Sequence, residues 1–362
     1  MELSWPGRLG RLRTVPEGHA IHRLATQFAQ VMSGEVVATS SPQGRFAAGA
    51  AELDGQRLVD VQAYGKHMFL GFAPRQTVAP RQTEPGATVA DCASPLTWLH
   101  IHLGIYGSWR FYGDSQFIAR HIGPALDFAE TAQTAAEIVE IPVHTHHDDS
   151  AFAPHEHFAD RWFWTPAPFT APSPYGTVRL RLITAHGAAD LSGPNTCELL
   201  DDAGVAAVFA RLGPDPLRPD CDFSEFVKRC STRQKGIGEA LMDQSVIAGV
   251  GNIYRAEVLY AVRLSPFTPA REVTSRKLRR IWNWLEEYLP LGVESGRITT
   301  ADPDDYATFV ERELAAGREP QAIDSRYYVY QRQDRPCLRC SATVKLRVAG
   351  GRKLYWCPRC QR

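Results

Sequence analysis

Four cysteines near the carboxyl end have the spacing of a metal site. Cys337 and Cys340 form one C-x2-C pair, and Cys357 and Cys360 form a second, separated from the first by sixteen residues. Two such pairs place four thiolates on two turns of a hairpin, which suits tetrahedral zinc. Because four cysteines leave no open coordination position, we expect one structural zinc ion. Disulfides would require an oxidising compartment, and residues 1–15 lack the apolar stretch of an export signal.

A second group of residues has the chemistry to hold a phosphate. Residues 249–252 (GVGN) precede a helical pattern. Asn252 there favours an N-cap, and the glycines let backbone N–H groups approach an anion closely. Arg352 follows two glycines, as at a hairpin tip, from which a guanidinium can reach a phosphate with two hydrogen bonds. A plain capped turn and a solvated arginine are the alternatives, and the zinc pattern and the basic tail favour the phosphate.

Several other residues are weaker candidates. Lys66 lies between two strand patterns, where a lysine is usually just solvated. Ile105 and Tyr106 stand between two glycines after an apolar strand, so they either form an ordinary hairpin tip or insert into a base stack. His100 and His102 form an H-x-H pair, which could bind a metal ion. We prefer the interpretation that both histidines lie on the polar face of a sheet.

The periodicity of apolar residues predicts the elements that position these groups. Residues 17–33 have the spacing of a helix, with Gly34 as its stop. Residues 59–63, 99–103 and 178–182 alternate apolar and polar side chains, as half-buried strands do. We therefore predict an α+β protein whose first half is a two-layer β-sandwich behind one leading helix.

Two stretches interrupt the strand pattern. Residues 73–95 and 113–174 are rich in Pro, Ala, Thr and acidic residues and have little periodicity. We expect insertions in surface loops that are at least partly disordered. The second stretch contains a group of five histidines: His144, His146, His147, His155 and His157. They could form a metal site, but we prefer the interpretation of a mobile polar loop.

A Pro- and Gly-rich linker at residues 212–219 (LGPDPLRP) marks a domain boundary. Beyond it, helices are predicted over residues 233–243, 252–262 and 272–291. The tail from residue 327 returns to short β segments around the cysteines.

Charge is distributed unevenly along the 362 residues, although 40 basic and 40 acidic residues give a net charge of zero. Residues 113–175 contain nine acids and two bases, whereas residues 326–362 contain ten bases and one acid. A basic module of this kind favours a polyanionic partner, with a solubilising surface as the alternative. No run of about 18 apolar residues is present, so we expect no membrane span.

Five motifs in order carry a resemblance to a known family. They are residues 15–19 (VPEGH), 65–67 (GKH), 102–107 (HLGIYG), 241–254 (LMDQ … GVGNIY) and 355–361 (YWCPRCQ). The sequence resembles the formamidopyrimidine-DNA glycosylase and endonuclease VIII family, and most closely the actinobacterial endonuclease VIII branch. The match covers most of the chain except the first fifteen residues and the two insertions.

The resemblance implies catalytic roles for four residues. Pro16 would be the nucleophile that attacks C1′ of the damaged nucleotide through its amine, and Glu17 would be the neighbouring acid–base group. Lys66 would donate a proton during β-elimination. Arg352 would hold a phosphate and assist δ-elimination. A terminal amine has a pKa of about 7.7–8.0, so a useful fraction is neutral and nucleophilic at cellular pH.

The resemblance also implies DNA contacts. Asn252 would bind a phosphate within a helix-two-turns-helix motif, and Ile105 and Tyr106 would fill the gap left by a flipped base. The implied protein is a bifunctional glycosylase and lyase of base-excision repair that acts on oxidised bases, pyrimidines in preference to purines. We expect a monomer that binds damaged double-stranded DNA in the bacterial cytoplasm. The alternative is a zinc-ribbon DNA-binding protein without catalysis.

The implied domains are a catalytic β-sandwich over residues 16–214 with the two insertions, a helix-two-turns-helix domain over 215–325, and a zinc finger over 326–362. Residues 1–15 are expected to be a mis-annotated extension. Pro16 has a nucleophilic amine only if it is the first residue of the protein. A GUG codon can start translation and is then read as methionine, but the same codon is written as valine, here Val15, when the start is placed upstream.

Two positions depart from the family pattern. Ala20 stands where a glutamate is often found, four residues after the proline, and Gly104 replaces a glutamine of some endonuclease VIII loops. Both bear on lesion preference.

Overall fold

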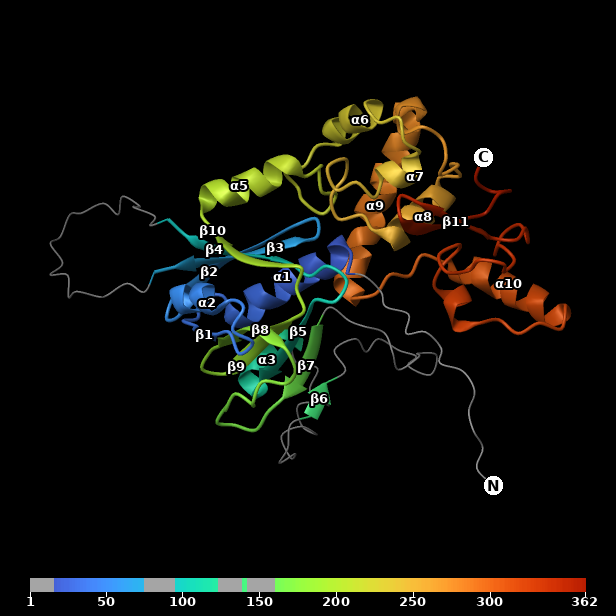
Figure 1. The fold of residues 1–362 in the computed structure, drawn as a ribbon. Coiled ribbons are helices and arrows are strands. Elements are labelled where there is room, and N and C mark those ends of the chain that lie inside the picture. The colour runs from blue at the N-terminus through green and yellow to red at the C-terminus, as the bar shows by residue number, and fades with distance from the viewer. Residues whose placement is uncertain (1–15, 75–94, 123–138, 142–159) are drawn as a thin grey trace, which may run out of the picture.

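The computed structural model describes residues 16–74, 95–122, 139–141 and 160–362. Residues 1–15, most of the stretch 73–95 and the five histidines between residues 144 and 157 lie outside these ranges. The order of elements is an α+β arrangement with sheets first, helices next and a hairpin last, as predicted (Figure 1). Among the described residues, no helix is both long and apolar enough to cross a bilayer.

The first domain is a β-sandwich with a leading helix. Its strands are β1 (Ala38–Ser40), β2 (Arg57–Tyr64), β3 (His67–Ala73), β4 (Thr97–His102), β5 (Ser108–Gly113), β6 (Val139–Ile141), β7 (Asp160–Trp164), β8 (Val178–Ile183), β9 (Gly187–Ser192) and β10 (Thr196–Leu200). One sheet has the order β1-β8-β9-β5-β7-β6 and the other β10-β4-β3-β2. Its helices are α1 (Gly18–Met32), α2 (Ala47–Leu53), α3 (Ser115–Ile122) and α5 (Asp202–Arg211).

Helix α1 packs in the core that the two sheets share. Its apolar residues Ile21, Leu24, Phe28 and Val31 recur at helical spacing and are all buried there. Burying side chains of this size stabilises the fold by about 1.5–3 kcal/mol each. The helix therefore fixes the residues that precede it, Pro16 and Glu17, to the rigid core of the domain.

The stretch 113–174 is not a surface loop throughout, which corrects the expectation. It contains α3, β6 and β7, and β7 pairs in parallel with β5 inside the larger sheet. Trp162 and Trp164 of β7 are buried. The strand has only five residues and lies between acidic and Pro-rich segments. A sequence window long enough to detect alternation therefore includes those segments, and the pattern of the strand is lost.

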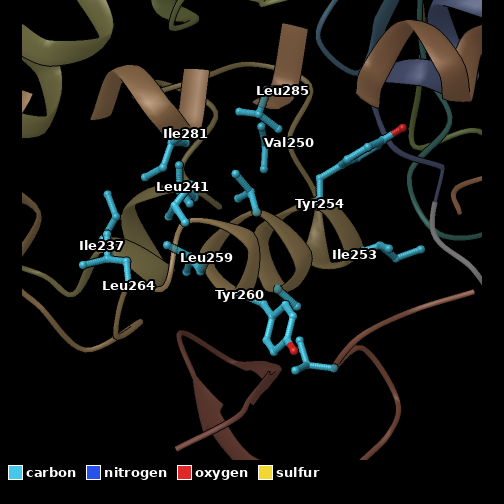
Figure 2. Packing of buried hydrophobic residues seen from close by; sticks show 14 of the residues in the cluster. Ile237, Leu241, Val250, Ile253, Tyr254, Leu259, Tyr260, Leu264, Ile281 and Leu285 are labelled. Atoms are coloured by element: carbon cyan, nitrogen blue, oxygen red, sulfur yellow. The ribbon is translucent and has the colours of Figure 1, made fainter. Parts of the chain in front are cut away.

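The second domain is helical. Its elements are α6 (Phe223–Ser231), α7 (Ile237–Ala240), α8 (Asn252–Ala261), η2 (Ala270–Glu272), α9 (Ser275–Ser295), α10 (Pro303–Ala315) and η3 (Ala322–Ser325). The predicted apolar face of α9 is buried, and Figure 2 shows Ile281 and Leu285 above Leu241 and Val250. The predicted helix over 233–243 is wrong in extent, because only the single turn of α7 forms between Gly236 and Leu241.

The carboxyl-terminal module is a two-stranded hairpin beside the four cysteines. β11 (Lys345–Ala349) pairs with β12 (Arg352–Trp356), and Gly350 and Gly351 form the tip with positive φ values of 57° and 73°. The tip therefore has the left-handed backbone that favours glycine, as the sequence predicted.

Candidate active site

The start of α1 lies against the start of α8. Glu17 is only 2% exposed. Its Oε1 accepts a hydrogen bond from the backbone N–H of Ile253 (2.7 Å), and its Oε2 accepts from those of Gly251 (3.0 Å) and Tyr254 (3.3 Å). The first N–H groups of a helix have no partner within it and favour an anion. The Glu17 carboxylate therefore occupies the anion site that α8 offers.

This contact corrects two expectations for residues 249–252. Gly251 is the N-cap of α8, so Asn252 is the first helical residue and not the cap. Backbone N–H groups at the helix start, which a phosphate was expected to use, are already bonded to Glu17. A phosphate at this place would have to be held by side chains.

Glycines allow three distant segments to meet at the backbone. The N–H of Gly18 donates to the carbonyl of Gly249 (2.8 Å), and a Cβ on Gly18 would lie 2.7 Å from the Gly249 Cα. Gly65 has a φ of 59°, and a Cβ there would lie 2.8 Å from that of Ala248. Any larger side chain at Gly18 or Gly65 would separate the segments. The segment of Pro16, the loop of Lys66 and the turn before α8 thus form one site.

Lys66 faces this junction. Its Nζ donates to the carbonyl oxygen of Val250 (2.8 Å). Burial lowers the pKa of the Lys66 amine to about 8; the Glu17 carboxylate opposes that shift, and the cations Arg352 and Arg255 add to it. Such a lysine is mostly protonated at neutral pH and releases its proton more readily than an ordinary lysine.

The Glu17 carboxyl is shifted in the direction that suits proton transfer. Burial raises its pKa, while the Lys66 ammonium and the three backbone N–H donors act in the opposite direction. A carboxyl with a raised pKa takes up a proton at a higher pH than an exposed carboxyl does.

Arg255 joins α8 to the hairpin. It is fully buried and donates to the Asn252 Oδ1, to the carbonyl of Gly238 (3.2 Å) and to that of Lys353 (2.9 Å). Arg352 is the neighbour of Lys353 and is exposed. Arg255 thus joins the Asn252 side chain to the backbone of the strand that carries Arg352.

The loop between β4 and β5 exposes its two apolar residues. Ile105 is 42% and Tyr106 66% exposed, so more than half of the Ile105 surface is covered while most of the Tyr106 surface is open. His102, just before the loop, pairs with His67, the neighbour of Lys66. The loop therefore begins beside the Lys66 segment.

Sequence reasoning missed Asp215. Its buried carboxylate accepts hydrogen bonds from the Gly65 N–H (2.7 Å) and the Leu217 N–H (3.0 Å), and it pairs with His22 Nε2 (2.8 Å). It fixes the Lys66 loop to α1 and to the linker between the domains. The signal in the sequence is an acidic residue between two prolines in the linker LGPDPL.

His100 and His102 do not form a metal site in the described structure. His100 is hydrogen-bonded through Nδ1 to Glu198 (2.9 Å) and through Nε2 to His67 (2.8 Å). Burial lowers the pKa of both His100 and His102, which keeps them neutral. The expected polar face is only partly found, because His100 is 4% exposed and its ring stacks on that of Phe69 with the centroids 4.7 Å apart.

The four cysteines converge. Ligand atoms of Cys337, Cys340, Cys357 and Cys360 all lie within 4.8 Å of one another, and they are the only such group of three or more possible ligands in the described ranges. The Tyr260 hydroxyl contacts the Cys337 Sγ at 3.2 Å, which ties the cluster to α8. Four thiolates in this arrangement suit tetrahedral zinc.

Comparison with known proteins agrees with this geometry. The description "Formamidopyrimidine-DNA glycosylase H2TH domain" matches residues 212–304, and "Zinc finger found in FPG and IleRS" matches residues 335–362. "Endonuclease 8 1" of Mycobacterium tuberculosis is 33% identical over 350 residues, which span 96% of this chain and 100% of that protein. The chain belongs to the formamidopyrimidine-DNA glycosylase and endonuclease VIII family. The module of residues 335–362 is accordingly a zinc finger that binds one structural zinc ion.

Other members of the family share the fold. The formamidopyrimidine-DNA glycosylase of Thermus thermophilus is 37% identical over 156 residues, 42% of this chain and 54% of that protein. A complex of Lactococcus lactis Fpg with DNA containing an abasic site has a TM-score of 0.61 at 17% identity, covering 96% of this chain and 99% of that one. The architecture therefore extends over nearly the whole chain.

Proposed function

We propose that this protein is a bifunctional enzyme of base-excision repair. It is a DNA glycosylase that removes oxidised bases, pyrimidines in preference to purines, and a lyase that then cuts the strand by β,δ-elimination. It acts as a monomer on damaged double-stranded DNA in the bacterial cytoplasm. Family membership supports the glycosylase, and the site supports the lyase.

One observation carries the proposal. The segment that begins with Pro16 and Glu17 is packed by backbone contacts against the Lys66 loop and the start of α8. These contacts support a site in which Pro16, a secondary amine once it is the first residue, stands next to a buried carboxyl and near a lysine with a pKa of about 8. A protein that only bound DNA would have no use for a proton donor and acceptor held beside a terminal amine.

The chemistry follows from these groups. The Pro16 nitrogen attacks C1′, the bond to the base breaks with its electron pair leaving on the base, and an iminium ion forms as the sugar opens. As the bond from C1′ to the ring oxygen breaks with its electron pair going to that oxygen, Glu17 takes the proton from the attacking nitrogen and gives one to the oxygen. Loss of a 2′ proton then expels the 3′ phosphate, and Lys66 is the group we assign to donate a proton in that step.

The other predicted residues serve DNA binding. Arg352 and the Asn252 side chain hold the phosphate beside the damaged nucleotide, and the hydrogen bonds of Arg255 to Asn252 and to the Lys353 carbonyl support this role. Ile105 and Tyr106 insert where the base was, because exposed apolar side chains at a loop tip can offset the few kcal/mol that extrusion of a base costs.

The test uses a protein that begins at Pro16. Borohydride should trap it covalently on an oligonucleotide with an abasic site, since reduction of the iminium fixes the adduct. Among duplexes with single lesions, thymine glycol and hydroxycytosine should be excised at least about tenfold faster than 8-oxoguanine, ~1.4 kcal/mol in activation free energy. DNA binding without an adduct would establish the non-catalytic alternative. Equal rates on all lesions would remove the pyrimidine preference alone.

The zinc finger should be needed for DNA binding more than for the fold of the sandwich. In Cys357→Ser, zinc should fall from one ion per chain to almost none and DNA affinity should be lost, because the tetrad closes a small separate module. Metal analysis, DNA titration and the melting temperature of the sandwich are the measurements. Cys197→Ser, a half-buried cysteine of β10, is the control and should keep the zinc. Full affinity without zinc would contradict the role of the finger.

A further inference from the structure

The hairpin of the zinc finger has one basic face. Arg347 pairs with Leu354, Ala349 with Arg352 and Lys345 with Trp356. Cross-strand partners lie on the same side of a sheet, and every second residue of a strand shares that side. Lys345, Arg347 and Arg352 therefore lie on the same face, at every second position, and all three are exposed. The same face also holds Ala349, Trp356 and the buried Leu354.

Arg347 is held in place without being neutralised. Its guanidinium carbon lies 5.2 Å from the centre of the Phe267 ring. Phe267 meets the Trp356 ring edge-on at 5.0 Å and is 38% exposed. Because Phe267 belongs to the helical domain and Trp356 to the hairpin, two domains build the platform. An arginine over an aromatic face keeps its N–H groups free for an anion.

Other arginines of the same module are paired with acids. Arg335 and Arg332 bind Asp324, and Arg339 binds Asp305. Neither Arg347 nor Lys345 has an ion pair or side-chain hydrogen bond with any residue of the described ranges. Their charge is therefore available to a partner.

We propose that Arg347 is a second phosphate-binding residue, which holds the DNA backbone next to the phosphate bound by Arg352, with Lys345 continuing the same track. The inference rests on the proposed function, which brings DNA to Arg352. Arg347 and Arg352 occupy diagonal positions on the two strands, about 7–8 Å apart, and Lys345 precedes Arg347 by about 6.6 Å along β11. Both steps are comparable with the distance between neighbouring phosphates of one DNA strand. The platform of Phe267 and Trp356 makes Arg347 the better ordered of the two added cations.

The experiment is a scan with neutral phosphates. A duplex with a reduced, uncleavable abasic site is prepared with one methylphosphonate at each successive position near the lesion. The wild type should lose affinity at each contacted phosphate. Arg347→Ala should bind the duplex about tenfold more weakly, and the slope of log affinity against log salt concentration should decrease by about one. At one position, the methylphosphonate should no longer weaken binding by this variant. That position should neighbour the one at which Arg352→Ala becomes insensitive.

Lys353→Ala is the matched control, because Lys353 is an exposed cation on the opposite face of the same hairpin. It should leave the map unchanged, and Arg347→Lys should recover most of the lost affinity. A wild-type map and salt slope for Arg347→Ala, with an altered map for Arg352→Ala, would overturn this inference alone. Absence of both the Arg352 effect and the borohydride adduct would instead reject the proposed function.

Discussion

A protein that begins at Pro16 will form a borohydride-trapped adduct with an abasic duplex, and the chain that retains residues 1–15 will not. With Val15 attached, the Pro16 nitrogen is a tertiary amide whose lone pair is delocalised into the carbonyl. As a terminal amine it has a pKa of about 7.7–8.0 and is partly neutral at cellular pH. We expect a difference of at least about 10³-fold in the initial rate of adduct formation, of the order that loss of a nucleophile produces.

Two controls separate chemistry from folding. A protein that begins at Pro16 but is acetylated on its terminal nitrogen should be as inert as the full chain, because that nitrogen is again a tertiary amide, although the acetyl group adds almost nothing to the structure. A form in which Pro16 is replaced by glycine should still be trapped, because a primary amine also forms an imine. Intact mass must establish each amino terminus. An adduct formed at the same rate by a chain that demonstrably retains residues 1–15 would refute the proline mechanism.

Local patterns were sufficient for much of the fold. The apolar faces of α1 and α9 follow helical spacing, and their residues are buried as predicted. The cysteine tetrad was predicted from spacing alone, because each pair of ligands lies within one turn of chain. In these elements, the residues whose spacing predicts the structure are the same neighbouring residues that form it.

The contact at the centre of the site could not be predicted in this way. Glu17 and the N–H groups of α8 are more than 230 residues apart in sequence, and their meeting depends on the packing of both domains. The turn at residues 249–252 looked open to a phosphate because a sequence pattern does not reveal which anion of the same chain reaches it. Asp215 was missed for a related reason, since its partners Gly65 and His22 lie in other segments.

Glu17→Gln should separate the two activities that are proposed for the site. Excision of an oxidised base needs a proton to be moved as the sugar opens, and positioned acid–base groups contribute about 10²–10⁴-fold to such steps. An abasic site has already lost its base and exists partly as the open aldehyde. Excision by the variant should therefore fall by about 10²–10⁴-fold, while borohydride trapping on an abasic duplex stays within about tenfold of the wild type.

The geometry explains why Glu17→Gln should remain folded. Trapping on the abasic duplex serves as the control, because it shows that the variant still binds DNA and forms the adduct. Glutamine can place its oxygen where Oε2 lies and keep the bonds from Gly251 and Tyr254, but its amide group cannot accept from Ile253. One lost bond of this kind costs about 1–3 kcal/mol, less than the stability of a typical domain. If excision and trapping fell by the same factor, Glu17 would act only by holding the start of α8. If neither fell, it would have no part in the reaction.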